Sequence, residues 1–392
     1  MESAYCIALK CKAALMSNHV DRIRTSGLIQ TARTLLSSGG TLESRSGTVP
    51  IDQDRISAAL EQHVDESHAL GVTNSKLVAA EVLSNVKSAL AKSAGGANLS
   101  NLTDAEWASL EAIVQVTGRP ALRYKDAKVE MPNDAGENEH WAVLIATARA
   151  SINRVSSSVG CVSRKGGRSS DELVGTAWRI GDDLVVTNRH VTARLVLRPD
   201  DPVDAWKLDG GKKPRVCFDA SATVPFAVSK IAYCSSEDAI DLAILHLDCT
   251  ESAPPPPLAI DWTPESIGVE ILDPGEEEPS FKGKEIYVVG HPYRQVGSNA
   301  IAKVFGNADG SKRCSPGYVT SIDRSDFEHD CSTLGGNSGS CVLTTGGHAV
   351  VGLHSGSLEV DASSGRGRAN VALALSRLGE GSARAILSSG RV

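Results

Sequence analysis

Residues 175–190 read GTAWRIGDDLVVTNRH, and the pattern in this stretch decides the fold class. Two short runs, Gly175–Ile180 and Leu184–Thr187, are rich in residues that favour β-strands, and Gly181 and two aspartates separate them. Short runs of this kind, bounded by turn-forming residues, predict β-strands. His190 closely follows the second predicted strand.

Runs of the same type recur from about residue 158 onward. Glycine, proline and aspartate separate them, and no long helical pattern intervenes. Many short strands with frequent turns are typical of an antiparallel barrel or sandwich. The further predicted strands are Val216–Phe218, Ala227–Tyr233, Leu242–Leu247, Glu285–Gly290, Tyr318–Ile322, Ser340–Leu343, Val350–Leu353 and Asn370–Ala374.

The N-terminal part follows a different pattern, in which apolar residues recur at helical spacing. A capping box, Thr103-Asp-Ala-Glu106, marks the start of one helix, because the Thr hydroxyl and the Glu carboxylate can each accept a hydrogen bond from a free backbone N–H. Gly118 and Pro120 end that helix. The predicted helices cover about residues 28–36, 77–90, 107–114 and 140–155.

The chain therefore divides into an N-terminal helical bundle and a C-terminal β-rich part, a multidomain α + all-β organisation. We expect a helical interaction or regulatory domain at residues 1–98, a helical linker module at 99–157 and the β-rich domain at 158–392. The aromatic residues follow the same division, and those that precede residue 140 are Tyr5, Trp107 and Tyr124.

The net charge of -7 at pH 7 gives the chain no overall basic field, so we expect neither nucleic acid nor an anionic membrane as a partner. No apolar run reaches the roughly 18 residues that a membrane span needs. Lys10 and Lys12 interrupt the apolar stretch near the N-terminus and no cleavage site follows it, so we expect no signal peptide. These features favour a cytoplasmic location.

The nine cysteines are odd in number and include no C-x-x-C pair, which argues against a disulfide framework and against a zinc site. We therefore expect reduced thiols. Other histidines lack the spacing of a metal site, and we predict neither a metal nor a cofactor; these histidines are His246, His291, His329 and His348.

Three segments of the β-rich part carry residues that can hydrolyse an amide when they meet in space. The first ends in His190, the second is Asp241–Leu245, and the third is Gly335–Ser340, with the sequence GGNSGS. A serine hydroxyl becomes a nucleophile when an imidazole takes its proton, and a carboxylate fixes the tautomer of that imidazole. Each segment alone is common, and the information lies in their order of His, Asp and Ser.

The glycines around Ser338 predict a second component of the same chemistry. Without a Cβ at Gly336, the backbone can turn so that the N–H groups of Gly336 and Ser338 converge on one point. Such a pair of donors stabilises the oxyanion that develops when a carbonyl is attacked. The expected oxyanion hole is therefore made by Gly336 and Ser338.

These segments resemble the chymotrypsin-fold serine peptidases, and most closely the bacterial group that includes the glutamyl endopeptidases. The resemblance covers about residues 155–380 and implies a double β-barrel with His190 as general base, Asp241 as orienting acid and Ser338 as nucleophile. Asp238 competes for the role of the acid. In the family, however, the acid directly precedes an apolar strand, which favours Asp241.

The same resemblance suggests a substrate preference. In glutamyl endopeptidases a Thr or Ser five residues before the nucleophile and a His on the following strand line the primary pocket, and Thr333 and His354 match these positions. This implies cleavage after Glu or Asp, or after Gln. Residues Ser355, Gly356 and Ser357 would then offer backbone groups to an extended substrate.

Two cysteines near Ser338 depart from the family pattern. Cys341 stands where a proline is common, and Cys331 lies shortly before the nucleophile. They could form a redox switch, but buried unpaired thiols are the favoured interpretation.

The helical part requires its own hypothesis. Residues 110–124, with Trp141 and Gly160, resemble a module that precedes trypsin-like domains in bacterial intracellular proteins, and the first 95 residues are similar in helix count to death-fold adaptors. We therefore expect an activating or adaptor protein as partner and a protein as substrate, in a setting such as bacterial defence or cell death. The alternatives are a scaffold that only covers the barrel, a catalytically silent pseudoprotease, and a protease limited to self-processing near Glu130, Glu137 or Glu139.

Overall fold

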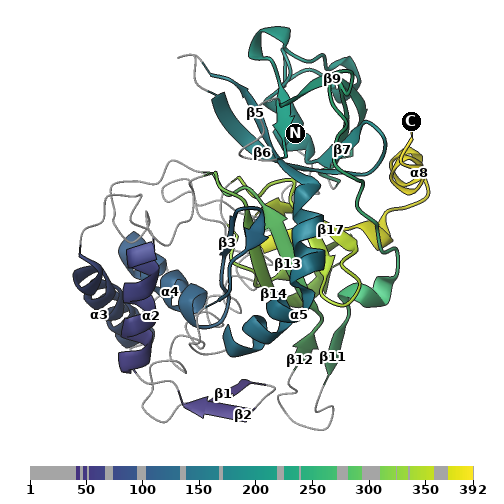
Figure 1. The fold of residues 1–392 in the computed structure, drawn as a ribbon. Helices are drawn as coiled ribbons and strands as arrows, with labels where there is room; N and C mark the ends of the chain where they lie inside the picture. The colour runs from purple at the N-terminus through teal and green to yellow at the C-terminus, as the bar shows by residue number, and fades with distance from the viewer. Residues whose placement is uncertain are drawn as a thin grey trace, which may run out of the picture.

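The computed structural model places two β-barrels in the C-terminal part of the chain and helices before them (Figure 1). The residues that the structure describes are 41–44, 47–50, 53–66, 74–94, 103–132, 138–166, 171–218, 225–237, 240–271, 281–293, 310–323, 325–333, 336–356 and 370–391. The expected helix at 28–36 lies outside them. Within them, no helix is long and apolar enough to cross a membrane.

The first barrel is closed by six antiparallel strands in the order β10-β7-β6-β5-β8-β9. Its strands are short and mostly buried, as the β-rich runs of the sequence predict. Residues 159–165 form a strand that the sequence analysis did not predict. The strands are β5 (Val159–Lys165), β6 (Asp171–Arg179), β7 (Leu184–Thr187), β8 (Arg215–Cys217), β9 (Phe226–Cys234) and β10 (Ala243–Leu247).

The second barrel follows the order β13-β16-β17-β18-β15-β14, and the pairing of β13 with β14 closes it. The prediction of an α + all-β chain with a chymotrypsin-like double barrel is therefore confirmed. The strands are β13 (Glu285–Gly290), β14 (Arg313–Asp323), β15 (Asp326–His329), β16 (Cys341–Thr344), β17 (Val350–Gly356) and β18 (Asn370–Ala374).

Helices and smaller elements surround the barrels. The short antiparallel pairs are β1 (Thr41–Ser44) with β2 (Gly47–Pro50), β3 (Leu122–Lys125) with β4 (Lys128–Val129), and β11 (Val269–Ile271) with β12 (Phe281–Gly283). The α-helices are α2 (Gln53–Glu66), α3 (Ser75–Ala94), α4 (Asp104–Thr117), α5 (Asn138–Ser157), α6 (Arg189–Ala193) and α8 (Ser382–Ser389). The expected helices at 77–90, 107–114 and 140–155 lie within α3, α4 and α5.

The hairpin of β3 and β4 is a feature that the sequence analysis missed. It lies inside residues 99–157, which we expected to be helical, and β3 extends the second barrel by pairing with β14, with Leu122 opposite Cys314. Leu122 and Val129 of the hairpin are buried with Ile145 of α5 in a cluster that also contains core residues of both barrels. The residues before the β domain are therefore part of its core, and the domain boundaries stay predictions.

The capping box predicted at the start of α4 is present. Glu106 accepts a hydrogen bond from the backbone N–H of Thr103 at 2.7 Å, and Thr103 Oγ1 accepts one from the N–H of Glu106 at 3.2 Å. Lys92 and Ser88 of α3 also donate to the Glu106 carboxylate, at 2.8 and 2.7 Å. The box therefore joins α4 to α3 as well as starting the helix.

Replacing Glu106 with glutamine is expected to lower the free energy of unfolding of the helical bundle by about 1–2 kcal/mol at pH 7. Burial raises the pKa of this carboxyl, but the hydrogen bonds from Lys92, Ser88 and Thr103 outweigh it and lower the pKa from 4.5 to about 2. Because the folded-state pKa lies below the unfolded one, the stabilisation is complete above pH 4.5 and is lost as the pH falls through about 2.

Denaturant unfolding followed by far-ultraviolet circular dichroism, at neutral pH and again near pH 3, measures this effect. The control is Glu81→Gln, at an exposed position of α3. A loss in the free energy of unfolding that is equal at both pH values, or equal in the two variants, would contradict the stabilising role of the ionised Glu106 carboxylate.

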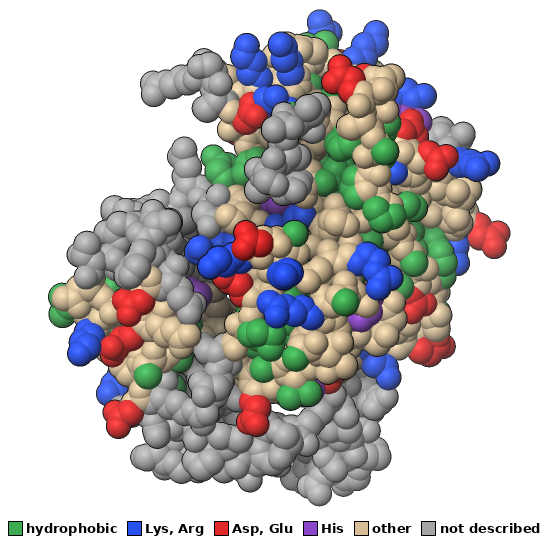
Figure 2. All heavy atoms as spheres, in the orientation of Figure 1, with side chains coloured by type: hydrophobic (Ala, Val, Ile, Leu, Met, Phe, Trp, Pro, Cys, Tyr) green, Lys and Arg blue, Asp and Glu red, His purple; other side chains and the backbone are tan. Residues whose placement is uncertain are grey.

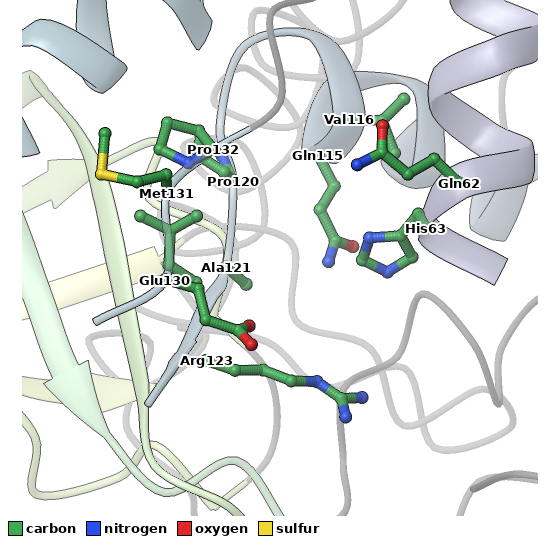
Figure 3. A pocket seen from close by; sticks show the side chains of 11 residues that line it. Gln62, His63, Gln115, Val116, Pro120, Ala121, Arg123, Glu130, Met131 and Pro132 are labelled. Carbon is green, nitrogen blue, oxygen red and sulfur yellow. The ribbon is translucent and has the colours of Figure 1, made fainter. Parts of the chain in front are cut away.

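A cavity of about 170 Å³ separates the helices from the β3–β4 hairpin. Gln62 and His63 of α2 and Gln115 of α4 face it from one side, and Arg123 and Glu130 of the hairpin face it from the other (Figure 3). Pro120 also lines this space, so the segment that follows α4 passes along the boundary between the bundle and the barrel.

Candidate active site

The first barrel brings His190 and Asp241 together, because the strands that lead to them are neighbours. His190 lies in α6, directly after β7, and Asp241 precedes β10, which pairs with β7 with Ala243 opposite Thr187. Asp241 Oδ2 lies 2.6 Å from His190 Nδ1, and Asp241 Oδ1 accepts the backbone N–H of His190 at 3.0 Å. Asn188 Nδ2 donates to the Asp241 carbonyl at 2.8 Å.

This geometry sets the chemistry of the imidazole. A carboxylate on Nδ1 holds the ring proton there, so Nε2 remains as the proton acceptor. Since both Asp241 carboxylate oxygens are bonded to His190, the residue can fix the orientation of the ring as well as its tautomer. The competing residue Asp238 lies outside the described residues.

Ser338 lies in a tight turn of the second barrel whose shape depends on two glycines. Gly336 has φ +95° and Gly339 has φ +87°, conformations that are costly for other residues. A Cβ at Gly336 would also clash with the Tyr293 backbone, and one at Gly339 with the Thr176 carbonyl. The turn therefore requires glycine at position 336, the role of Gly336 in an oxyanion hole stays a prediction, and Gly335 lies outside the described residues.

The first barrel anchors this turn through β6. The Thr176 backbone N–H donates to the Ser338 carbonyl at 2.8 Å, and Thr176 Oγ1 donates to the Gly336 carbonyl at 3.0 Å. From the second barrel, the His354 carbonyl accepts the N–H of Gly339 at 2.9 Å. The turn that presents Ser338 is therefore held between the two barrels.

Gly175 shows how close the serine turn lies to the histidine helix. A Cβ at Gly175 would lie 2.7 Å from a Val191 methyl group and 3.0 Å from the Ser338 carbonyl oxygen. Val191 is the neighbour of His190, so the backbone of Ser338 and the start of α6 flank the same glycine. The structure thus gathers His190, Asp241 and Ser338 at the junction of the barrels, and their catalytic roles stay predictions.

Thr333 and His354 have polar partners that the sequence analysis did not identify. Thr333 Oγ1 donates to Asn370 Oδ1 at 2.6 Å, and Asn370 Nδ2 donates to the Cys331 carbonyl at 2.7 Å. His354 Nδ1 lies 3.1 Å from His329 Nε2. Asn370 and His329 come from β18 and β15, and no local motif marks either residue.

Burial makes His354 a neutral group. Its side chain is 2% exposed, and burial, followed by His329 and then His190, lowers its pKa well below 6.5. In the tautomer in which Nδ1 of the neutral His354 ring accepts a hydrogen bond from His329 Nε2–H, the His354 proton lies on Nε2, from which it can donate a hydrogen bond to a substrate. His354 can therefore act as a hydrogen-bond donor without carrying a charge.

The remaining predicted substrate residues follow His354 along β17. Ser355 Oγ donates to the Val371 carbonyl at 3.2 Å, and Gly356 lies opposite Val371 of β18. Ser357 lies outside the described residues. Recognition of an extended substrate by these backbone groups stays a prediction.

The two cysteines near Ser338 are free and buried, as the favoured interpretation predicts. Burial raises the pKa of both thiols, so they remain protonated at neutral pH. Cys341 Sγ lies 3.8 Å from the Val289 carbonyl. These thiols pack in the barrel as small apolar groups.

The surface charge and the metal-ligating side chains were compared with what a charged patch or a metal site would require. On the face shown in Figure 2, Lys and Arg side chains are interspersed with Asp and Glu over the described surface. Among the residues that the structure describes, no group of three or more His, Cys, Asp or Glu side chains could hold a metal ion.

Comparisons with known proteins give one family match. Residues 175–353 match the Trypsin-like peptidase domain family, a range that contains His190, Asp241 and Ser338. The chain is also similar to the crystal structure of the Rv3671c protease from M. tuberculosis in its active form, with 19% sequence identity and a TM-score of 0.34 over 57% of this chain and 78% of that one. None of the curated proteins compared with the chain matches it. The family match and the closed double barrel together support a trypsin-like peptidase domain in the C-terminal part of the chain.

Proposed function

We propose that this chain is a serine endopeptidase in which Ser338 is the nucleophile, His190 the general base and Asp241 the orienting acid. The observation that carries the proposal is the His190–Asp241 pair, with Nδ1 and the backbone N–H bonded to the two carboxylate oxygens at 2.6 and 3.0 Å. This arrangement leaves Nε2 as the base, in a domain whose family hydrolyses peptide bonds.

In the proposed reaction the Ser338 oxygen attacks the scissile carbonyl carbon, and its proton passes to His190 Nε2. The carbonyl oxygen becomes an oxyanion that the N–H groups of Gly336 and Ser338 stabilise. The C–N bond then breaks, and His190 gives the proton to the leaving amine. Water, deprotonated by the same imidazole, hydrolyses the resulting ester and restores the Ser338 hydroxyl.

We further propose that the enzyme cleaves after Glu or Asp, or after Gln. The neutral His354 imidazole supports this, because it can donate a hydrogen bond to a carboxylate or an amide oxygen, and the Thr333 hydroxyl can do the same when its proton turns from Asn370 Oδ1 to the substrate. The His329–His354 pair adds support, since it orients the His354 ring from within the core. The glutamyl endopeptidase resemblance suggests the same preference.

A peptide-library cleavage profile tests this preference. We expect cleavage after Glu, Asp or Gln, and Thr333→Val is expected to lower kcat/KM for such peptides by about tenfold, because the isosteric side chain removes one donor. Thr320→Val, at an exposed position of β14, is the matched control. Cleavage after Arg, Lys or large apolar residues, or an unchanged kcat/KM in Thr333→Val, would overturn the pocket assignment.

The location and control of the enzyme complete the proposal. The free cysteines among the described residues support a cytoplasmic enzyme, which needs control to spare its host. We place that control in the N-terminal helices, through an activating or adaptor protein, in a setting such as bacterial defence or cell death. A chain lacking residues 1–98 that cleaved peptides at the same rate as the full chain, with and without added cell extract, would argue against this control.

A further inference from the structure

The segment Gly118–Pro120, which follows α4, lies against the loop that leads to the nucleophile. Arg119 Nε and Nη2 both lie 2.7 Å from Asp330 Oδ2. The Ser332 hydroxyl donates to the Arg119 carbonyl. A residue outside the barrels thus contacts two residues of the stretch that immediately precedes Thr333.

Aromatic rings hold the Arg119 side chain in place. Its guanidinium carbon lies 4.8 Å from the Tyr318 ring centre and 5.9 Å from that of Trp141, within the range of cation–π attraction. Trp141 is fully buried and donates from Nε1 to the Gly118 carbonyl at 2.7 Å. The Arg119 side chain is only 14% exposed, so packing restrains the guanidinium side of the ion pair, while the Asp330 side chain is 32% exposed.

The loop 330–333 is held from two sides. Asp330 Oδ2 bonds to Arg119, while Asp330 Oδ1 accepts the Tyr318 backbone N–H at 2.7 Å. From the opposite side, Asn370 bonds to the Cys331 carbonyl and the Thr333 hydroxyl. Partners therefore alternate along the loop, with Arg119 bound to residues 330 and 332 and Asn370 to residues 331 and 333.

The nucleophile turn has a separate anchor. Thr176 of β6 bonds to the carbonyls of Gly336 and Ser338, and neither bond involves Arg119. A change at Arg119 should therefore move the pocket wall at Thr333 more than it moves the Ser338 hydroxyl.

We propose that Arg119 is a positioning residue that holds the 330–333 wall of the substrate pocket and thereby links helix α4 to substrate binding. The link to substrate rests on the proposed peptidase function. Because Arg119 follows α4 directly, a shift of that helix is transmitted through the ion pair to the residues beside Thr333. The helical bundle then acts on peptide recognition, while the chemistry at Ser338 keeps its own support.

The test compares Arg119→Met with Arg164→Met in the full chain. Arg164 is a matched control in the first barrel, because its Nε and Nη2 both lie 2.9 Å from Glu172 Oε2 and its Nη1 donates to a backbone carbonyl, as Arg119 Nη1 does. Two activities are measured: kcat and KM for a peptide with the preferred P1 residue, and the rate at which a small alkyl fluorophosphonate labels Ser338.

We expect Arg119→Met to lower kcat/KM for the peptide by about 10–100-fold, mainly through KM, because a displaced wall misplaces the substrate. Labelling of Ser338 should change by less than about threefold, since the reagent needs the nucleophile more than the pocket. Arg119→Lys, which keeps the charge, should recover part of the loss. Arg164→Met should leave both activities near those of the wild type.

A peptide kcat/KM within about twofold of the wild type would overturn the proposal, as would an equal loss of labelling, which indicates general damage. Hydrogen–deuterium exchange of residues 330–333 gives a readout without catalysis. Faster exchange in Arg119→Met than in Arg164→Met supports the positioning role, and unchanged exchange overturns it. If the wild type neither cleaves nor is labelled, the proposed function fails, and the exchange result still decides the role of Arg119.

Discussion

Replacing Ser338 with alanine is expected to lower kcat for peptide hydrolysis by about six orders of magnitude and to abolish labelling by a fluorophosphonate. The hydroxyl is the only group of that side chain that can form the ester with the substrate. The fold should persist, because Ser338 is bonded to β6 through its carbonyl, which the substitution retains. Peptide turnover and circular dichroism of the same preparation measure the two effects.

Ser340→Ala is the matched control for this variant. Ser340 lies in the same turn, but its hydroxyl is buried and lies 3.4 Å from Asn337 Oδ1, so it is not presented to a substrate. We expect it to retain labelling. Hydrolysis that survives in Ser338→Ala would falsify the assignment of the nucleophile, and a folded wild type that is never labelled would favour a peptide-binding pseudoprotease. An intact mass that changes on incubation only in the wild type would indicate self-processing.

Asp241→Asn is expected to lower kcat by about four orders of magnitude while the fold is retained. An asparagine amide facing His190 Nδ1 at 2.6 Å would donate to that nitrogen, so the ring proton would move to Nε2. The imidazole would then be unable to accept the proton of Ser338. The loss should be smaller at high pH if hydroxide replaces the histidine as base, which a pH–rate profile measures.

The first barrel contains a matched control for Asp241. His246 Nδ1 of β10 lies 2.6 Å from Oδ2 of Asp183, which is in the turn between β6 and β7, so the same pairing occurs at the same distance in the same barrel. Asp183→Asn is expected to leave kcat near that of the wild type. Asp238→Asn tests the competing acid in the same assay. If Asp238→Asn removes activity and Asp241→Asn does not, the orienting acid is misassigned.

The barrel strands illustrate what can be predicted from local pattern. β7, β13 and β18 begin and end where the β-rich runs do, because a short apolar run and the turn residues that bound it act over a few positions. β5 and β15 were missed. Both β5 (Val159–Lys165) and β15 (Asp326–His329) mix apolar, polar and charged residues, and the burial of β5 depends on β6 and β8 beside it.

The candidate site shows the same contrast. The order of His190, Asp241 and Ser338 is visible in the sequence because each lies in a short motif. Asn370 and Arg119 lie in no such motif, and their importance comes from contacts with residues 331–333 and 330 that are distant along the chain.

The sequence alone therefore indicated the helical and β-rich parts, most strands of the barrels and the candidate residues His190, Asp241 and Ser338, since these depend on interactions between near neighbours. Only the tertiary structure joined the β3–β4 hairpin to the second barrel, paired His190 with Asp241, and placed Arg119 against Asp330. The physical reason is that such contacts form only when strand pairing closes the barrels. A local pattern of residues does not reveal which distant segments will then be neighbours.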